Sequence, residues 1–274
     1  MQKCSTLKST KSVEELYSFV TDFRKTIDGS QSECLAVFDV DQTLIRAVPP
    51  VASSISHKVH EDLFKRLLSE LPIEQEYLLA HLPLSVPSNN AVREEKTVDV
   101  FNKLHEDGHP VIALTASLTG PFESYERFEV FRFNLLKDLG FNFSEIYQEP
   151  EVPFSGFVDF RGLPPSYYKG MINTNGLFGG RSKGKILMAC LDKLNTVPCG
   201  VIFVDDVEAN VHGVAEAMEV VRVPCLSILY NAALWRHEEL AEESDFESYW
   251  TAAIAEIKQN YLRENNFMPS SRAL

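Results

Sequence analysis

The chain has 274 residues, 45% of them hydrophobic, which is enough to bury a full core without disulfides or structural metals. Its 26 basic and 39 acidic residues give a net charge of −13, which repels a polyphosphate backbone and argues against nucleic-acid binding. No apolar run reaches the roughly 18 residues of a membrane span. The first residues lack the apolar stretch of a secretory signal, so we expect a cytoplasmic protein.

The first predicted element is a helix that begins after Ser12 and runs to about Ile27. Ser12 and Glu15 have the spacing of a capping box, in which each side chain bonds the other residue's backbone N–H. After a polar turn, the run from Cys34 to Phe38 is apolar without alternation. Such a run is typical of a strand buried on both faces of a parallel sheet.

Two similar runs follow at Val111–Leu114 and Val201–Val204, and a weaker candidate strand lies at Val220–Val223. Amphipathic helices are predicted before or between them, at about 98–108, 125–139 and 185–194. Strands that alternate with helices predict an α/β fold, a Rossmann-like three-layer arrangement around a parallel sheet.

The spacing of these elements also predicts the domain organisation. Residues 46–93 are too long for a simple crossover between the first two strands, and they contain a predicted helix at Ser56–Leu71. We interpret 46–93 as a small helical cap, and 1–45 with 94–262 as the catalytic core. Residues 263–274 are predicted to be a disordered tail.

Polar residues follow the three strands: Asp39 and Asp41 the first, Thr115 the second, and Asp205 and Asp206 the third. Ligands of open parallel sheets bind at the carboxyl ends of the strands, so we expect these side chains to share one crevice. Four carboxylates in one crevice repel each other unless a cation lies among them. Mg²⁺ prefers oxygen ligands and also binds substrate phosphate, so the pattern predicts a magnesium site.

These segments resemble the four motifs of the haloacid dehalogenase (HAD) superfamily, in the family's order and over residues from about 35 to 223. The resemblance rests on the run from Asp39 to Leu44, on Leu114 with Thr115, on Lys183, and on Asp205 and Asp206 with Asn210. The layout is most similar to a bacterial HAD family of unknown function, which shares a stretch like Tyr168–Ile172. The resemblance implies the fold and the chemistry, but no substrate.

The resemblance to the HAD superfamily implies that Asp39 is the nucleophile that forms an aspartyl-phosphate and that Asp41 is the general acid and base. An acid at Asp41 points to phosphatase or phosphotransferase chemistry, because the dehalogenase and ATPase branches lack it. Thr115 would bond a phosphoryl oxygen, and Lys183 would neutralise the developing charge. Lys185 is the alternative to Lys183.

The resemblance implies three direct Mg²⁺ ligands, which are Asp206, Asp39 and the backbone carbonyl of Asp41. Asp205 would act through a water molecule or as a partner of these ligands. Asn210 is expected to cap or orient rather than to bind the metal.

One departure from the family pattern is Ser117, where many relatives carry an arginine. We expect Arg127 or Arg181 to supply the substitute charge.

We therefore expect a Mg²⁺-dependent HAD-type phosphatase that hydrolyses a small phosphorylated substrate or a phosphoprotein. A phosphotransferase or phosphomutase with the same first step is the enzymatic alternative. An inactive HAD-fold binding protein is the other alternative, and Ser117 gives it some support.

Overall fold

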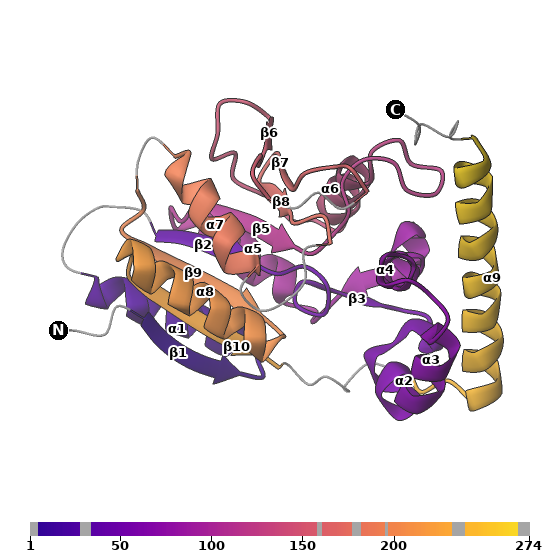
Figure 1. Cartoon of the computed structure of the whole chain (residues 1–274). Coiled ribbons are helices and arrows are strands. Elements are labelled where there is room, and N and C mark those ends of the chain that lie inside the picture. The colour runs from indigo at the N-terminus through magenta and orange to yellow at the C-terminus, as the bar shows by residue number, and fades with distance from the viewer. Residues whose placement is uncertain are drawn as a thin grey trace, which may run out of the picture. The chain divides into compact units, whose positions relative to one another are not determined.

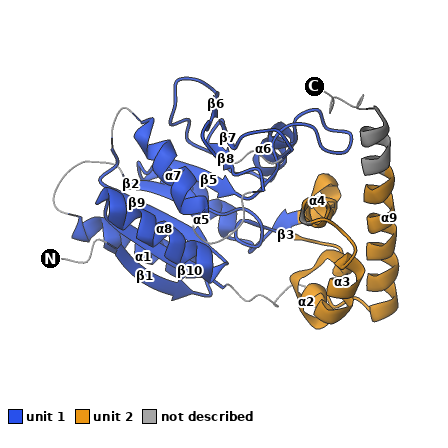
Figure 2. Cartoon of the chain, in the orientation of Figure 1, with its two compact units in different colours: residues 1–46, 91–233 blue, residues 47–90, 234–274 orange. Residues whose placement is uncertain are grey.

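The computed structural model describes residues 5–27, 34–157, 161–176, 182–194, 197–231 and 239–267 (Figure 1). The chain forms two compact units (Figure 2). Unit 1 comprises Met1–Arg46 and Ala91–Ala233, and unit 2 comprises Ala47–Asn90 and Leu234–Leu274.

Unit 1 is built on an eight-stranded sheet with the order β1-β10-β9-β2-β5-β8-β7-β6. Its strands are β1 Ser5–Thr10, β2 Cys34–Phe38, β5 Val111–Thr115, β6 Glu151–Pro153, β7 Ser166–Tyr168, β8 Met171–Asn173, β9 Gly200–Asp205 and β10 Cys225–Tyr230. Pairing is parallel from β1 to β8, and β7 and β6 continue the sheet in antiparallel pairs. The predicted α/β fold with a mostly parallel sheet is confirmed.

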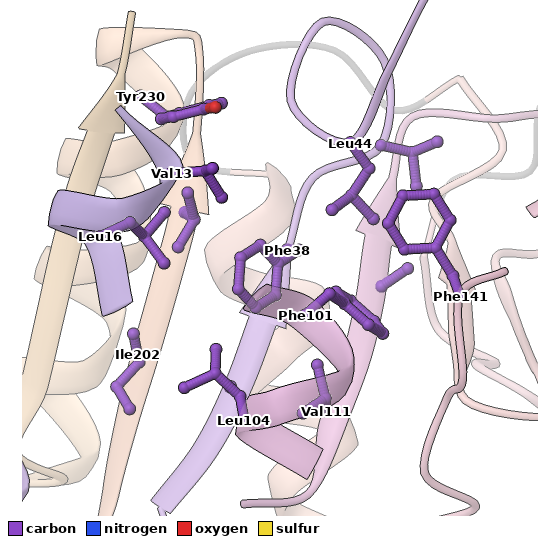
Figure 3. Packing of buried hydrophobic residues seen from close by; sticks show 14 of the residues in the cluster. Val13, Leu16, Phe38, Leu44, Phe101, Leu104, Val111, Phe141, Ile202 and Tyr230 are labelled. Atoms are coloured by element: carbon purple, nitrogen blue, oxygen red, sulfur yellow. The ribbon is translucent and has the colours of Figure 1, made fainter. Parts of the chain in front are cut away.

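Helices cover both faces of this sheet, which gives three layers (Figure 1). The helices of unit 1 are α1 Val13–Thr26, α5 Thr97–Glu106, α6 Phe128–Asp138, α7 Ser182–Asp192 and α8 Glu208–Val221. Side chains alternate along β2, so Ala36 and Phe38 pack with α1, α5 and α6, whereas Leu35 and Val37 pack with α7 and α8. On the first face, the ring of Phe38 lies 5.3 Å from that of Phe101 in α5 (Figure 3).

The three apolar runs predicted as buried strands are β2, β5 and β9, and every residue in them is buried. The weaker candidate at Val220–Val223 is wrong, because α8 continues to Val221 and β10 follows it. Val220 is 72% exposed and lies on the outer face of α8. The helix ends where Arg222 adopts a left-handed conformation with φ 58°.

Strand β1 was not predicted, because its residues are polar and show no apolar alternation. It pairs with β10 at the edge of the sheet, where only Ser5 and Thr10 are buried. Ser12 is the N-cap of α1 as predicted, and its side chain accepts a bond from the N–H of Glu14. Glu15 instead accepts a 2.5 Å bond from the hydroxyl of Thr10, so it ties β1 to α1.

Unit 2 is helical. Its elements are η1 Pro50–Ala52, α2 Ser54–Val59, α3 Glu61–Leu68, α4 Ile73–His81, η2 Pro83–Ser85, η3 Pro87–Asn89 and α9 Glu243–Phe267. Two short strands, β3 Ile45–Ala47 and β4 Asn90–Val92, pair where the chain enters and leaves the insertion. The predicted helix at Ser56–Leu71 is broken at His60, whose backbone is not helical. Its ring bonds the carbonyl of Ala241 at 2.9 Å.

The predicted extent of the core, to residue 262, is wrong. Residues from 243 onward form α9, and Phe246, Trp250 and Ile254 of α9 share a hydrophobic cluster with Leu63 and Leu79 of the insertion. The helical insertion therefore completes its core with a helix from the other end of the chain. Residues 263–267 of the predicted tail belong to α9, and 268–274 lie outside the described residues. Among the described helices, none combines the length and the apolarity that a bilayer crossing requires.

Candidate active site

The candidate site lies at the carboxyl ends of three adjacent strands, with β2 between β5 and β9. Phe38 is in register with Ala113 of β5 and with Val204 of β9. The N–H of Asp39 donates to the carbonyl of Val204 at 2.8 Å, so the ladder continues one residue beyond β2. Because the strands are parallel and in step, Asp39, Thr115 and Asp205 emerge at the same edge.

A tight turn after β2 orients Asp39. The carbonyl of Val40 accepts bonds from the N–H groups of Leu44 and Ile45, at 2.8 and 3.0 Å. This turn brings the hydroxyl of Thr43 back to Oδ2 of Asp39, at 3.3 Å. Gln42 adopts a φ of 65° within it, and the guanidinium of Arg93 donates to its side chain at 3.0 Å.

Three carboxylates gather at this edge, and one oxygen from each of Asp39, Asp205 and Asp206 lies within 4.8 Å of the others. Asp39 and Asp205 are buried, whereas Asp206 is partly exposed. The carboxylate of Asp41 is not part of this group, so the predicted cluster of four is three carboxylates with a fourth beside them. The role predicted for the backbone carbonyl of Asp41 stays a prediction.

Lys183 supplies the positive charge inside the cluster. Its Nζ contacts Oδ1 of Asp39 and donates to Oδ2 of Asp205 at 2.7 Å. Lys185, the alternative from the sequence, is exposed. A Cβ at Gly184 would lie 2.5 Å from the carbonyl of Gly213 in α8, so only glycine allows the close approach of α7 to α8 that carries Lys183 inward.

Asp205 has both carboxylate oxygens engaged by protein donors. Oδ1 accepts from the N–H of Val207 at 2.8 Å and from the amide of Asn210 at 3.0 Å. Oδ2 accepts from Asn210 at 3.1 Å as well as from Lys183. Asp205 therefore anchors Lys183 and Asn210, and Asp206 is the more open of the two neighbouring carboxylates.

Asp41 is held on both of its oxygens. The hydroxyl of Thr115 donates to Oδ2 at 3.4 Å, so the residue predicted to bond a phosphoryl oxygen bonds Asp41 here. Arg132 of α6 donates from Nη2 to Oδ1 at 2.5 Å. Arg132 is completely buried, whereas the side chain of Asp41 is 31% exposed.

Arg132 was missed by the sequence analysis, which considered Arg127 and Arg181 instead. Arg127 is engaged elsewhere, because it forms ion pairs of 2.8 Å with Glu129 and with Glu151. Arg181 lies outside the described residues. The missed signal is that Arg132 falls on the apolar face of the predicted helix, four residues after Phe128, where a charge needs a buried partner.

The carboxylates of the cluster resist being charged together. Burial raises the pKa of Asp39 well above its usual value, the charges of Asp205 and Asp206 add to this, and Lys183 opposes it. Burial and the neighbouring Asp205 raise the pKa of Asp206 to about 7. Burial works against the charge of Lys183, but Asp205 and Asp39 outweigh it and raise its pKa. A site with this balance gains from an additional cation.

A stability measurement tests this balance. The raised folded-state pKa of Asp206 means that its protonated form stabilises the fold below about pH 4, and that this contribution is lost as pH rises through about 7. A cation binds the deprotonated site, so we expect Mg²⁺ to raise the melting temperature at pH 8 and to have little effect at pH 5. At 100 times its dissociation constant, the ion would add about 2.7 kcal/mol to the free energy of unfolding.

Asp206→Asn should abolish this shift in melting temperature, whereas Asp192→Asn, at the exposed end of α7, should keep it. An equal shift in melting temperature at both pH values would contradict cation binding by the deprotonated carboxylate of Asp206.

Comparison with known proteins places the chain in a family. A family model described as "Protein of unknown function (DUF2608)" matches residues 10–268. An uncharacterised protein of Rickettsia conorii is 21% identical over 93% of this chain and 86% of its own length. An uncharacterised protein of Rickettsia felis is 20% identical over the same shares, and one of Rickettsia prowazekii is 22% identical over 65% of this chain and 61% of its own. Since the family model covers nearly the whole sequence, the chain belongs to the DUF2608 family of proteins of unknown function.

Proposed function

We propose that this protein is a Mg²⁺-dependent phosphomonoester hydrolase that works through an aspartyl-phosphate on Asp39. The observation that carries the proposal is the meeting of Asp39, Asp205 and Asp206 at the sheet edge, with Lys183 bridging Asp39 and Asp205. The HAD-like motif order agrees with it. The separate position of Asp41, close by but outside the carboxylate cluster, supplies a second acid for proton transfer.

The donor set fits a hard divalent cation. Carboxylate oxygens are the ligands that Mg²⁺ prefers, and three of them lie within 4.8 Å of one another. Asp206 would hold the ion directly, because it is the more open carboxylate, whereas both oxygens of Asp205 are already bonded by protein donors. Asp39 would hold the ion through Oδ2, whose bond from Thr43 is long at 3.3 Å, because Lys183 contacts its Oδ1. When bound, the ion would neutralise charge on the phosphoryl oxygens and on the cluster.

The protein residues would then carry out two displacements. In the first, a carboxylate oxygen of Asp39 forms a bond to phosphorus while the bond from phosphorus to the leaving oxygen breaks, and Asp41 gives its proton to that oxygen. In the second, water attacks the same phosphorus, Asp41 takes the proton from the water, and the bond to Asp39 breaks. Phosphate leaves and the Asp39 carboxylate is restored. Lys183 stays paired with Asp205 and balances the charge on Asp39 throughout.

Hydrolysis of an aryl phosphate, with Mg²⁺ and after chelation by EDTA, tests this proposal. We expect turnover in Mg²⁺, a fall of roughly 100-fold or more on chelation, and recovery when Mg²⁺ is added back. Turnover that is indifferent to EDTA would refute the metal, and no turnover on aryl phosphates or phosphoserine would favour an inactive binding protein. Transfer of the phosphoryl group to an added alcohol faster than to water would identify a phosphotransferase instead.

A further inference from the structure

Several buried polar groups on α6 and at the ends of β5 and β8 are not used by the chemistry above. In the part of the chain that the structure describes, no hydrogen-bond partner exists for Nε and Nη1 of Arg132, Oγ of Ser117, or either amide atom of Asn173. All three side chains are completely buried. Burying such groups without partners is unfavourable, so these donors and acceptors are available to a ligand.

These groups belong to segments that meet on one side of the sheet. Thr115 and Asn173 are paired in register at the ends of β5 and β8. Ala113 and Met171, two residues earlier, belong to the core cluster that also contains Leu135 and Leu136 of α6. Because strand side chains alternate, Thr115 and Asn173 point to the face that α6 covers, and Arg132 lies on α6 one turn before Leu135 and Leu136.

Ser117 belongs to the same place. Its N–H donates to the hydroxyl of Thr115 at 3.2 Å, and its carbonyl accepts from the N–H of Asn175 at 3.1 Å. The segment after β5 therefore runs beside the segment after β8. Ser117 stands where the sequence lacks the arginine of the HAD pattern, and Arg132 brings a guanidinium to the neighbouring carboxylate of Asp41.

The guanidinium has more donors than Asp41 uses. Arginine offers five N–H groups in a planar fork that matches multi-oxygen anions, and only Nη2 is engaged by a carboxylate oxygen. Asp41 is also the exposed member of this pair, at 31%. Asp41 therefore lies on the solvent side of the pair, whereas Arg132 is fixed by burial.

We propose that Arg132 is the oxyanion-binding residue of this protein. Without substrate, the carboxylate of Asp41 pairs with the guanidinium of Arg132. The phosphoryl group of a phosphomonoester, which is a tetrahedral oxyanion, then displaces Asp41 from this contact. Ser117 and Asn173 supply further hydrogen bonds to it. The assignment rests on the proposed function for the identity of the ligand, and it adds the residue that binds the ligand. It also gives Asp41 a second role, as the resident anion that the substrate displaces.

Calorimetric titration with inorganic phosphate in Mg²⁺ buffer tests the assignment by binding rather than turnover. We expect Arg132→Lys to weaken phosphate binding about tenfold or more, since one monodentate ammonium replaces the fork. Arg127→Lys, at the start of the same helix, should bind phosphate as the native protein does. Asp41→Asn should bind phosphate several-fold more tightly than native, because the competing charge is gone. That gain should disappear when Arg132→Lys is added.

Binding that is unchanged by Arg132→Lys in a folded variant, or no binding by native protein, would overturn the assignment. If circular dichroism shows that Arg132→Lys does not fold, Asp41→Asn decides alone, and equal or weaker binding by it overturns the assignment. Phosphate binding that depends on Arg132 in a protein without hydrolysis would refute the proposed function and leave this inference standing. Hydrolysis by a protein whose phosphate binding does not depend on Arg132 would support the proposed function and overturn this inference.

Discussion

Asp39→Asn is expected to lower phosphatase turnover by roughly 10³-fold or more and, at the same time, to make the metal-free protein more stable. The activity is lost because an amide cannot form the aspartyl-phosphate. The stability rises because burial and the charges of Asp205 and Asp206 raise the pKa of Asp39, which means that the fold favours a neutral group there. Asparagine has the same shape without the charge. We expect a gain of roughly 1–2 kcal/mol in the free energy of unfolding at pH 8.

Two measurements separate these effects. Aryl phosphate hydrolysis is measured in Mg²⁺, and urea unfolding is measured in EDTA at pH 5 and pH 8. The stability gain should be smaller at pH 5 than at pH 8, because the raised pKa favours proton uptake by the native carboxyl as the pH falls, and the protonated carboxyl resembles the amide. Asp192→Asn, an exposed carboxylate at the end of α7, should change neither quantity. An active Asp39→Asn would remove Asp39 as the nucleophile, and a less stable one would mean that the Lys183 contact outweighs the repulsion.

The parts of the fold that were predictable from the sequence are those with a local signal. Cys34–Phe38 and Val111–Leu114 are continuous apolar runs, and such runs are found in strands that are covered on both faces. Polar residues directly after such strands then fall at one sheet edge for purely topological reasons. The meeting of Asp39, Asp205 and Asp206 follows from this argument. Strand β1 has no such signal, because its four exposed residues lie at the edge of the sheet.

The parts that were not predictable depend on contacts between distant segments. Arg132 and Asp41 are 91 residues apart, and their pairing depends on how α6 lies across the sheet. The periodicity of α6 shows that Arg132 is on the buried face, but not which carboxylate it meets. Helix α9 is similar: Trp250 and Phe246 mark an apolar face, yet nothing local shows that this face packs on the insertion rather than on the sheet.

Lys183→Met is expected to lower the free energy of unfolding by about 3–5 kcal/mol at pH 8, because it leaves buried carboxylates without their cation. Lys183 is buried and joins Asp39 to Asp205, and its charge is the influence that lowers the pKa of Asp39. Without it, that already raised pKa rises further. When the pKa of an acid is higher in the folded than in the unfolded state, the acid destabilises the fold at pH values above its folded-state pKa. It has no such effect below its unfolded-state pKa. The loss of unfolding free energy should therefore be smaller at pH 5 than at pH 8.

Urea unfolding of Lys183→Met at the two pH values measures this dependence, with Lys185→Met as the matched control on the exposed side of the same helix. The free energy of unfolding of the control should stay within about 0.5 kcal/mol of that of the native protein at both pH values. Adding Asp39→Asn to Lys183→Met should restore part of the lost stability, because one of the two unpaired charges is then removed. A loss that is independent of pH and unaffected by Asp39→Asn would instead assign the effect to lost packing of the lysine side chain. If the coupling is found, the same buried lysine that makes the acidic cluster tolerable for folding also favours the ionised form of Asp39, which is the state that a nucleophile requires.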